Sequence, residues 1–188
     1  MKIAIIGSHC TGKTSLIDKL QALPEFYDYS FYPEAIREIS RLGFPYNEAA
    51  DDCSQLAMCA LHLLHLKYDK MVTDRCILDN YVYAYMLRDM GSDISDQCID
   101  TLQSYFIKNI NNYDIYAFCP VEFKIINDWY RMTDKRTQED ISEEILRTLI
   151  KYIPSDKYIL LYGETEERVK QLLEFKHAKE KLKEKIDA

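Results

Sequence analysis

The sequence predicts an α/β fold in which a parallel β-sheet of about five strands is covered by helices on both faces. Two observations predict it. Short apolar runs typical of buried strands alternate along the chain with longer segments whose apolar residues recur at helical spacing. The first apolar run also leads into a glycine-containing turn that opens a helix. Because the chain has 188 residues, of which 47% are hydrophobic, we expect one core and a single domain, residues 1–188.

The first half of the chain is predicted to hold three strands, each apolar or aromatic and followed by turn or charged residues: 2–6, 30–32 and 71–73. Helices are expected between them, from Lys13 to the Leu23-Pro24 break, over 35–41, and over 49–68. The last two helices are separated by Gly43-Phe44-Pro45-Tyr46-Asn47, a segment that breaks the helical pattern.

The second half is predicted to continue the alternation. Two further strands are expected over 113–118, closed by Pro120, and over 158–162. Four helices complete the prediction: 79–90 and 94–110, separated by Gly91-Ser92, then 138–152, and finally Thr165 to the end.

A phosphate-binding motif lies at the end of the first strand. Gly7-Ser8-His9-Cys10-Thr11-Gly12-Lys13-Thr14 fits the P-loop pattern G-x-x-x-x-G-K-[ST], and the helical residues from Ser15 onward follow it. The backbone N–H groups of such a loop surround a phosphate, toward which the next helix points its positive dipole end. We expect Lys13 to neutralise the β- and γ-phosphates of a nucleoside triphosphate and the Thr14 hydroxyl to ligate Mg²⁺.

Asp74 and Arg75 follow the strand at 71–73. Because the carboxyl ends of parallel strands share one edge of a sheet, Asp74 is expected near Thr14, where it would hold the metal through water. Arg75 is expected where charge develops on a phosphoryl group or on the acceptor oxygen. An isolated Asp-Arg pair is more often a structural charge pair, but the P-loop favours the catalytic interpretation.

Glu34 and Arg37 follow the strand at 30–32, at the same edge. The Glu34 carboxylate could accept a proton from a substrate hydroxyl. Arg37, one helical turn later, could fix an acceptor phosphate or ribose. The alternative is a helix cap at Glu34 with an ordinary surface pair at Arg37.

A charged connection joins the last two strands. It spans about 121–140 and contains Arg131 and Arg136. Connections of this length are commonly active-site lids that close over bound phosphates and exclude water. Either arginine could then supply positive charge to the transferring group, whereas a solvated loop is the alternative interpretation.

Charge and cysteine content restrict the class of protein. The net charge of −7 argues against extensive non-specific nucleic-acid binding, although it does not exclude a local basic groove. Lysines near the C-terminus alternate with glutamates, which favours a solvated helix face. The six cysteines lack C-x-x-C pairs and matching histidines, so we expect reduced, mostly buried thiols. Without an apolar leader or a run near the ~20 residues that cross a bilayer, we expect a soluble, cytoplasmic protein.

Together these motifs resemble the nucleoside and nucleotide kinase branch of the P-loop proteins, and most closely the small ATP-binding kinases that include ribosylnicotinamide kinase domains. The resemblance covers nearly the whole chain and implies the P-loop NTPase fold. It also implies that Asp74 organises the metal and the acceptor, that Arg75 and the lid arginines near Asp134-x-Arg136 handle phosphate, and that Glu34 lies by the acceptor hydroxyl.

The resemblance implies two further binding roles. Gly163 and Glu164, after the last strand, would border the adenine. Gln55, in the helix predicted over 49–68, would read an acceptor base, although a single glutamine on a helix is usually a surface residue. The chain has no aromatic residue next to Glu34, where deoxynucleoside kinases have one, and this leaves the acceptor pocket undefined.

These residues predict in-line transfer of the ATP γ-phosphoryl group to a hydroxyl or phosphate of a small nucleoside-like acceptor, with Mg²⁺ as cofactor. One alternative is a kinase that acts on a nucleic-acid end or modified base, which needs a basic groove leading to Asp74. The other is a nucleotide-driven ATPase or switch, but Cys76-Ile77-Leu78 offer no group to order a water. The sequence does not identify the acceptor or decide between ATP and GTP as the phosphate donor. It also does not determine the oligomeric state, for which a homodimer is one option.

Overall fold

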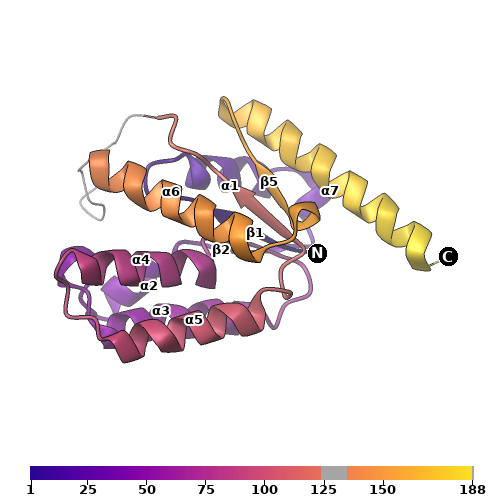
Figure 1. Cartoon of the computed structure of the whole chain (residues 1–188). Coiled ribbons are helices and arrows are strands. Elements are labelled where there is room, and N and C mark those ends of the chain that lie inside the picture. The colour runs from indigo at the N-terminus through magenta and orange to yellow at the C-terminus, as the bar shows by residue number, and fades with distance from the viewer. Residues whose placement is uncertain (124–134, 188) are drawn as a thin grey trace.

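The computed structural model describes residues 1–123 and 135–187. Five strands form one sheet in the order β2-β3-β1-β4-β5, and every neighbouring pair is parallel. Figure 1 shows the helices packed around this sheet. The strands are β1 (Lys2–Ile6), β2 (Ser30–Tyr32), β3 (Met71–Asp74), β4 (Ile115–Phe118) and β5 (Tyr158–Leu160). The predicted α/β fold with a parallel five-stranded sheet is confirmed.

The described residues also contain seven α-helices and three short 3-10 helices. The α-helices are α1 (Lys13–Gln21), α2 (Ala35–Arg41), α3 (Asp52–His65), α4 (Ile77–Asp89), α5 (Asp96–Asn109), α6 (Lys135–Tyr152) and α7 (Thr165–Asp187). The 3-10 helices are Pro24–Phe26, Asn47–Ala49 and Ser155–Lys157. Each predicted helix is present. The boundaries differ by two or three residues at the starts of α3 to α6 and at the end of α3, which ends at His65 rather than at 68.

Side-chain caps set the starts of two helices away from the predicted positions. Helix α3 begins at Asp52 because the Asp51 carboxylate accepts a hydrogen bond from Ser54 N at 2.7 Å. Helix α4 begins two residues earlier than predicted, since the Asp79 carboxylate accepts from Cys76 N at 3.0 Å and closes a capping box.

The predicted lid differs from the structure at its end. Residues 135–140 are the first turns of helix α6, which begins at Lys135 rather than near Gln138. Residues 124–134 of the predicted lid lie outside the described residues.

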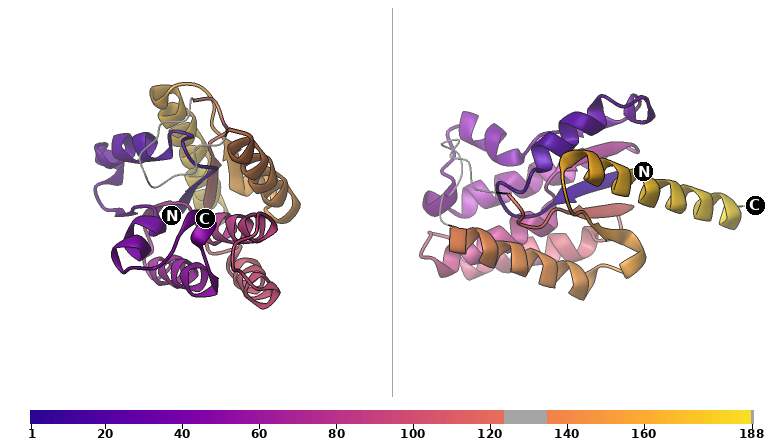
Figure 2. Two further views of the ribbon diagram at one scale, coloured as in Figure 1. Left: turned by 90° about the vertical axis from the view of Figure 1, so that its left-hand side faces the viewer. Right: turned by 90° about the horizontal axis from the view of Figure 1, so that it is seen from above.

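Two apolar layers hold the helices on the sheet. Because successive strand residues point to opposite faces, Ala4 and Ile6 pack with α3 to α6, whereas Ile3 and Ile5 pack with α1 and α7. The views in Figures 1 and 2 show these two helix layers on either side of the sheet. The larger layer contains Leu102, Phe106 and Ile145, which are at most 1% exposed.

Strand register brings the functional segments to one edge of the sheet. Ile5 of β1 lies opposite Asp74 of β3, and Arg75 N donates to Ile5 O at 2.9 Å. On the other side of β1, Cys119 N donates to Ile6 O at 2.8 Å. Gly7 therefore sits against Cys119, whose carbonyl oxygen would lie 2.5 Å from an added Cβ, and only glycine fits there.

The structure confirms the prediction of free, mostly buried cysteines and corrects one detail of the C-terminal lysines. All six cysteines are free, and only Cys53 is exposed. No helix within the described residues is long and apolar enough to cross a membrane. The C-terminal lysines are mostly exposed as expected, but Lys176 is 5% exposed because it packs over the Phe26 and Tyr29 rings and pairs with Glu180.

We expect Ile145→Ala to lower the free energy of unfolding by about 2 to 4 kcal/mol, since it empties a fully buried site under the sheet. Ile150→Ala, on the same helix but 57% exposed, is the matched control and should change it by less than about 0.5 kcal/mol. Urea unfolding of both variants checks this. Equal effects would mean that α6 does not pack on the sheet as described.

Candidate active site

The P-loop joins β1 to α1 and is folded around its own lysine. Cys10 and Gly12 have φ angles of 56° and 81°, which turn the backbone into a concave loop. The buried Lys13 ammonium donates to Ser8 O at 2.5 Å and to Thr11 Oγ1 at 3.4 Å. Burial, helped by the nearby Arg75 guanidinium, lowers the pKa of Lys13. Phosphate oxygens are the acceptors that would best replace these loop atoms around the cation.

Thr14 and Asp74 meet as predicted. The Thr14 hydroxyl donates to Asp74 Oδ2 at 3.1 Å. Asp74 is 3% exposed, and its Oδ1 atom is buried without a hydrogen-bond partner. Burial raises the pKa of Asp74, while the nearby Lys13 lowers it. A hydroxyl and a carboxylate with a vacant oxygen suit Mg²⁺, which takes few protein oxygens and keeps its waters.

Arg75 and Glu34 form a largely buried ion pair at the ends of β3 and β2, with side chains 11% and 10% exposed. Arg75 Nε donates to Glu34 Oε1 at 2.5 Å, and Nη1 donates to Gly7 O at 2.8 Å. The guanidinium also lies over the Tyr83 ring, 4.5 Å from its centroid. Burial lowers the pKa of Arg75, but Tyr83 and the carboxylates outweigh it and hold the pKa well above its ordinary value. Arg75 is therefore a fixed cation.

Asp79 is a site residue that the sequence did not reveal. Its side chain is fully buried, and Oδ1 accepts from Gly7 N at 3.0 Å. The same carboxylate lies 3.8 Å from Arg75 Nη1. Asp79 thus ties the first residue of the P-loop to the start of α4. A capping-box position three residues after Cys76 is the only sequence signal that marks it.

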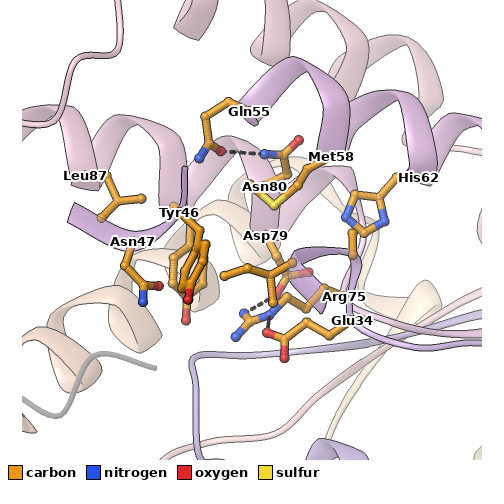
Figure 3. A pocket seen from close by; sticks show the side chains of 13 residues that line it. Glu34, Tyr46, Asn47, Gln55, Met58, His62, Arg75, Asp79, Asn80 and Leu87 are labelled. Carbon is orange, nitrogen blue, oxygen red and sulfur yellow. Dashed lines mark hydrogen bonds and ion pairs between the residues drawn. The ribbon is translucent and has the colours of Figure 1, made fainter. Parts of the chain in front are cut away.

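A pocket opens beside this network (Figure 3). Gln55 is 1% exposed, lines the pocket and accepts from Asn80 Nδ2 at 2.8 Å, so it is not a surface residue. Its predicted role in reading a base stays a prediction. The lining also includes the charged residues Glu34, Arg75 and Asp79. Its other residues are apolar or uncharged: Ala35, Ile36, Tyr46, Asn47, Met58, His62, Asn80, Tyr83 and Leu87.

The remaining predicted residues lie in different surroundings. Arg37 lines an adjoining pocket with Thr14, Glu34 and Asp74, not the pocket of Figure 3. Arg136 is exposed in the first turn of α6, and Arg131 lies outside the described residues.

The predicted adenine border lies at the start of α7. Gly163 N donates to Glu122 Oε2, and Glu164 N donates to Glu167 Oε2, both at 2.9 Å. These contacts define the β5 to α7 turn, and its role toward adenine stays a prediction.

His62 should make stability depend on pH. Burial, followed by His65 and Arg75 and opposed by Glu34, lowers the pKa of His62 from 6.5 to about 3. His62 therefore becomes protonated near pH 6.5 in the unfolded chain but stays neutral in the folded chain until about pH 3. The free energy of unfolding falls as the pH drops below about 6.5. From pH 7 to 5, we expect His62 alone to remove about 2 kcal/mol.

Urea unfolding at both pH values checks this. Between pH 7 and pH 5, the free energy of unfolding of His62→Gln should fall by about 2 kcal/mol less than that of the parent. His177→Gln, which replaces a half-exposed histidine of α7, should behave like the parent. An identical pH dependence in His62→Gln and the parent would contradict the prediction.

Solved structures share this fold. The chain aligns with the NadR protein in complex with NR at a TM-score of 0.73 and 19% identity, covering 94% of this chain and 50% of that one. It aligns with deoxyadenosine kinase from M. mycoides at a TM-score of 0.68 and 14% identity, covering 95% of this chain and 100% of that one. The alignment with shikimate kinase from Aquifex aeolicus has a TM-score of 0.57 and 15% identity, and it covers 95% of this chain and 98% of that one. The chain spans about half of the NadR chains.

These likenesses confirm the predicted P-loop kinase-like fold. No curated protein matches the sequence. The profile of the AAA domain family matches residues 2–168, a range that contains the P-loop, the Asp74-Arg75 strand end and Gly163. Since this match covers most of the chain, the protein belongs to the AAA domain family.

Proposed function

We propose that the protein is an ATP-dependent phosphotransferase that moves the γ-phosphoryl group to a hydroxyl of a small, nucleoside-like acceptor. The observation that carries this proposal is that Arg75 contacts the P-loop at Gly7 O and lines the neighbouring pocket. Arg75 therefore borders both the phosphate-binding loop and the small-molecule pocket. A donor bound in the loop and an acceptor bound in the pocket would come together beside Arg75.

The donor side would hold the nucleotide. Lys13 and the loop N–H groups would bind the phosphates, and Gly163 and Glu164 would border the adenine. Thr14 and Asp74 would hold Mg²⁺, and the unpartnered Asp74 Oδ1 supports this assignment. Bound Mg²⁺ would supply positive charge to the phosphate oxygens.

The acceptor side offers a base. In the proposed reaction the acceptor hydroxyl gives its proton to the Glu34 carboxylate, and its oxygen forms a bond to the γ-phosphorus. The bond from that phosphorus to the bridging oxygen breaks, which releases ADP. Arg75 orients Glu34 through their 2.5 Å hydrogen bond and stays charged near the oxygen that becomes negative.

The charge of the pocket favours an acceptor without a phosphate. Among the described lining residues, Arg75 is the only fixed cation, and it already binds Glu34 and Gly7 O. Asp79 adds a second carboxylate, and the lowered pKa of His62 keeps that ring neutral at pH 7. A nucleoside therefore fits this pocket better than a nucleoside monophosphate. The structures named NadR with NR and deoxyadenosine kinase are compatible with this class of acceptor.

We expect ATP-dependent phosphorylation in a panel of nucleosides, nucleoside monophosphates and oligonucleotides, with the highest kcat/KM for an uncharged nucleoside. Lys13→Ala should lower kcat at least about 100-fold, since a preorganised charged donor to the phosphates is lost. Lys19→Ala, an exposed lysine of α1, is the matched control and should retain parent activity. Full activity in Lys13→Ala would exclude this function.

Glu34→Gln separates acceptor from donor. It removes the carboxylate that would take the proton, so kcat should fall about 100-fold or more while ATP affinity stays near the parent value. Glu38→Gln, one turn later on α2 and paired with Arg41 at the surface, is the control. Steady-state kinetics and calorimetric titration of ATP give both quantities. Unchanged kcat, or a large loss of ATP affinity, would contradict the assignment.

A further inference from the structure

Side chains from three parts of the fold hold the P-loop by its carbonyl groups. Gly7 O accepts from Arg75 Nη1 at 2.8 Å, at the end of β3. The other two contacts come from far along the chain. His9 O accepts from Gln138 Nε2 of α6 at 2.7 Å, and Thr11 O accepts from Arg168 Nη1 of α7 at 2.6 Å. The three carbonyls belong to alternate residues of the loop.

A donor that holds a carbonyl group also fixes the direction of the N–H group that follows it. In a planar trans peptide the C=O group and the following N–H group point in opposite directions. A carbonyl held from outside the loop therefore turns the next N–H group toward the opposite side. The peptide between Ser8 and His9 has the opposite orientation, with its carbonyl turned into the loop and its N–H group turned out of it. Its carbonyl accepts from Lys13 Nζ, while His9 N donates to the Tyr83 hydroxyl at 2.9 Å.

The contacts from α6 and α7 are shielded from water. Gln138 and Arg168 are each 1% exposed, so water cannot readily replace either donor. Arg168 also donates to Gly163 O at 2.9 Å and pairs with Glu122 at 2.6 Å, which fixes its guanidinium in the loop wall. Helices α6 and α7 pack on opposite faces of the sheet (Figures 1 and 2), so the loop is held from both sides.

We propose that Gln138 and Arg168 are positioning residues of the phosphate site. They fix the peptides after His9 and Thr11, and thereby direct the N–H groups of Cys10 and Gly12 toward the bound phosphates. Neither side chain touches a reacting atom. The inference rests on the proposed function in one respect, because the anion in the loop is taken to be the polyphosphate of a nucleotide.

The test measures phosphate binding apart from catalysis. Gln138→Leu and Arg168→Met remove the donors while keeping most of the side-chain volume. Calorimetric titration with MgATP and with magnesium tripolyphosphate should show dissociation constants about tenfold higher for each variant, the size of one net hydrogen bond. Gln103→Leu, which loses a hydrogen bond to Tyr81, and Arg147→Met on the exposed side of α6 are matched controls and should stay within about twofold.

Conservative variants keep the test decisive if a donor-free variant does not fold. Gln138→Asn and Arg168→Lys retain a donor and should recover part of the tripolyphosphate affinity. Folded variants that bind tripolyphosphate as tightly as the parent would overturn the inference. So would losses of affinity that merely follow losses of thermal stability and appear equally in the two controls. If the parent binds neither ligand, the proposed function fails, and this inference fails with it.

Discussion

The buried Arg75 guanidinium is the contact on which the site depends. It joins the ends of three neighbouring strands, because it donates to Glu34 after β2 and to Gly7 O after β1 while its own residue follows β3. Arg75 has a φ of 72°, a left-handed conformation that costs an ordinary residue about 1 kcal/mol or more. Such a conformation persists only where surrounding contacts enforce it, and here the buried ion pair does so. Removing Glu34 or Arg75 would leave the other charge buried and unpaired.

The same network sets the electrostatics of the site. Two cations, the buried Lys13 and the largely buried Arg75, face three buried carboxylates, Glu34, Asp74 and Asp79. With all five groups ionised, one negative charge is in excess, and the pKa values of Asp74 and Asp79 are raised mainly by burial. A divalent cation beside Thr14 and Asp74 would reverse that excess and favour the ionised carboxylates. Metal binding would therefore be linked to the protonation state of the site.

Local patterns predicted the strands, the helices and the P-loop, since each is encoded by neighbouring residues. Four residues were expected on the acceptor side. The structure brings Glu34, Gln55 and Arg75 into one pocket, whereas Arg37 lines the adjoining one. The sequence did not reveal Gln138 or Arg168. Arg168 lies in a helix of alternating charges that looks fully solvated, and only the packing of α7 against the P-loop buries it. A single polar residue in an amphipathic helix gives no signal that distinguishes burial from exposure.

The P-loop motif is thus an incomplete description of the phosphate site. Glycines permit the turn, but the carbonyls of His9 and Thr11 are held by donors that lie about 130 to 160 residues further along the chain. A ligand that binds only the correctly turned loop must also stabilise the packing of α6 and α7 that supplies those donors, by mass action. If Gln138 and Arg168 position the loop as proposed, nucleotide binding and the docking of the two helices form one coupled equilibrium. The C-terminal third of the chain would then have to pack on both faces of the sheet before the N-terminal motif could bind phosphate well.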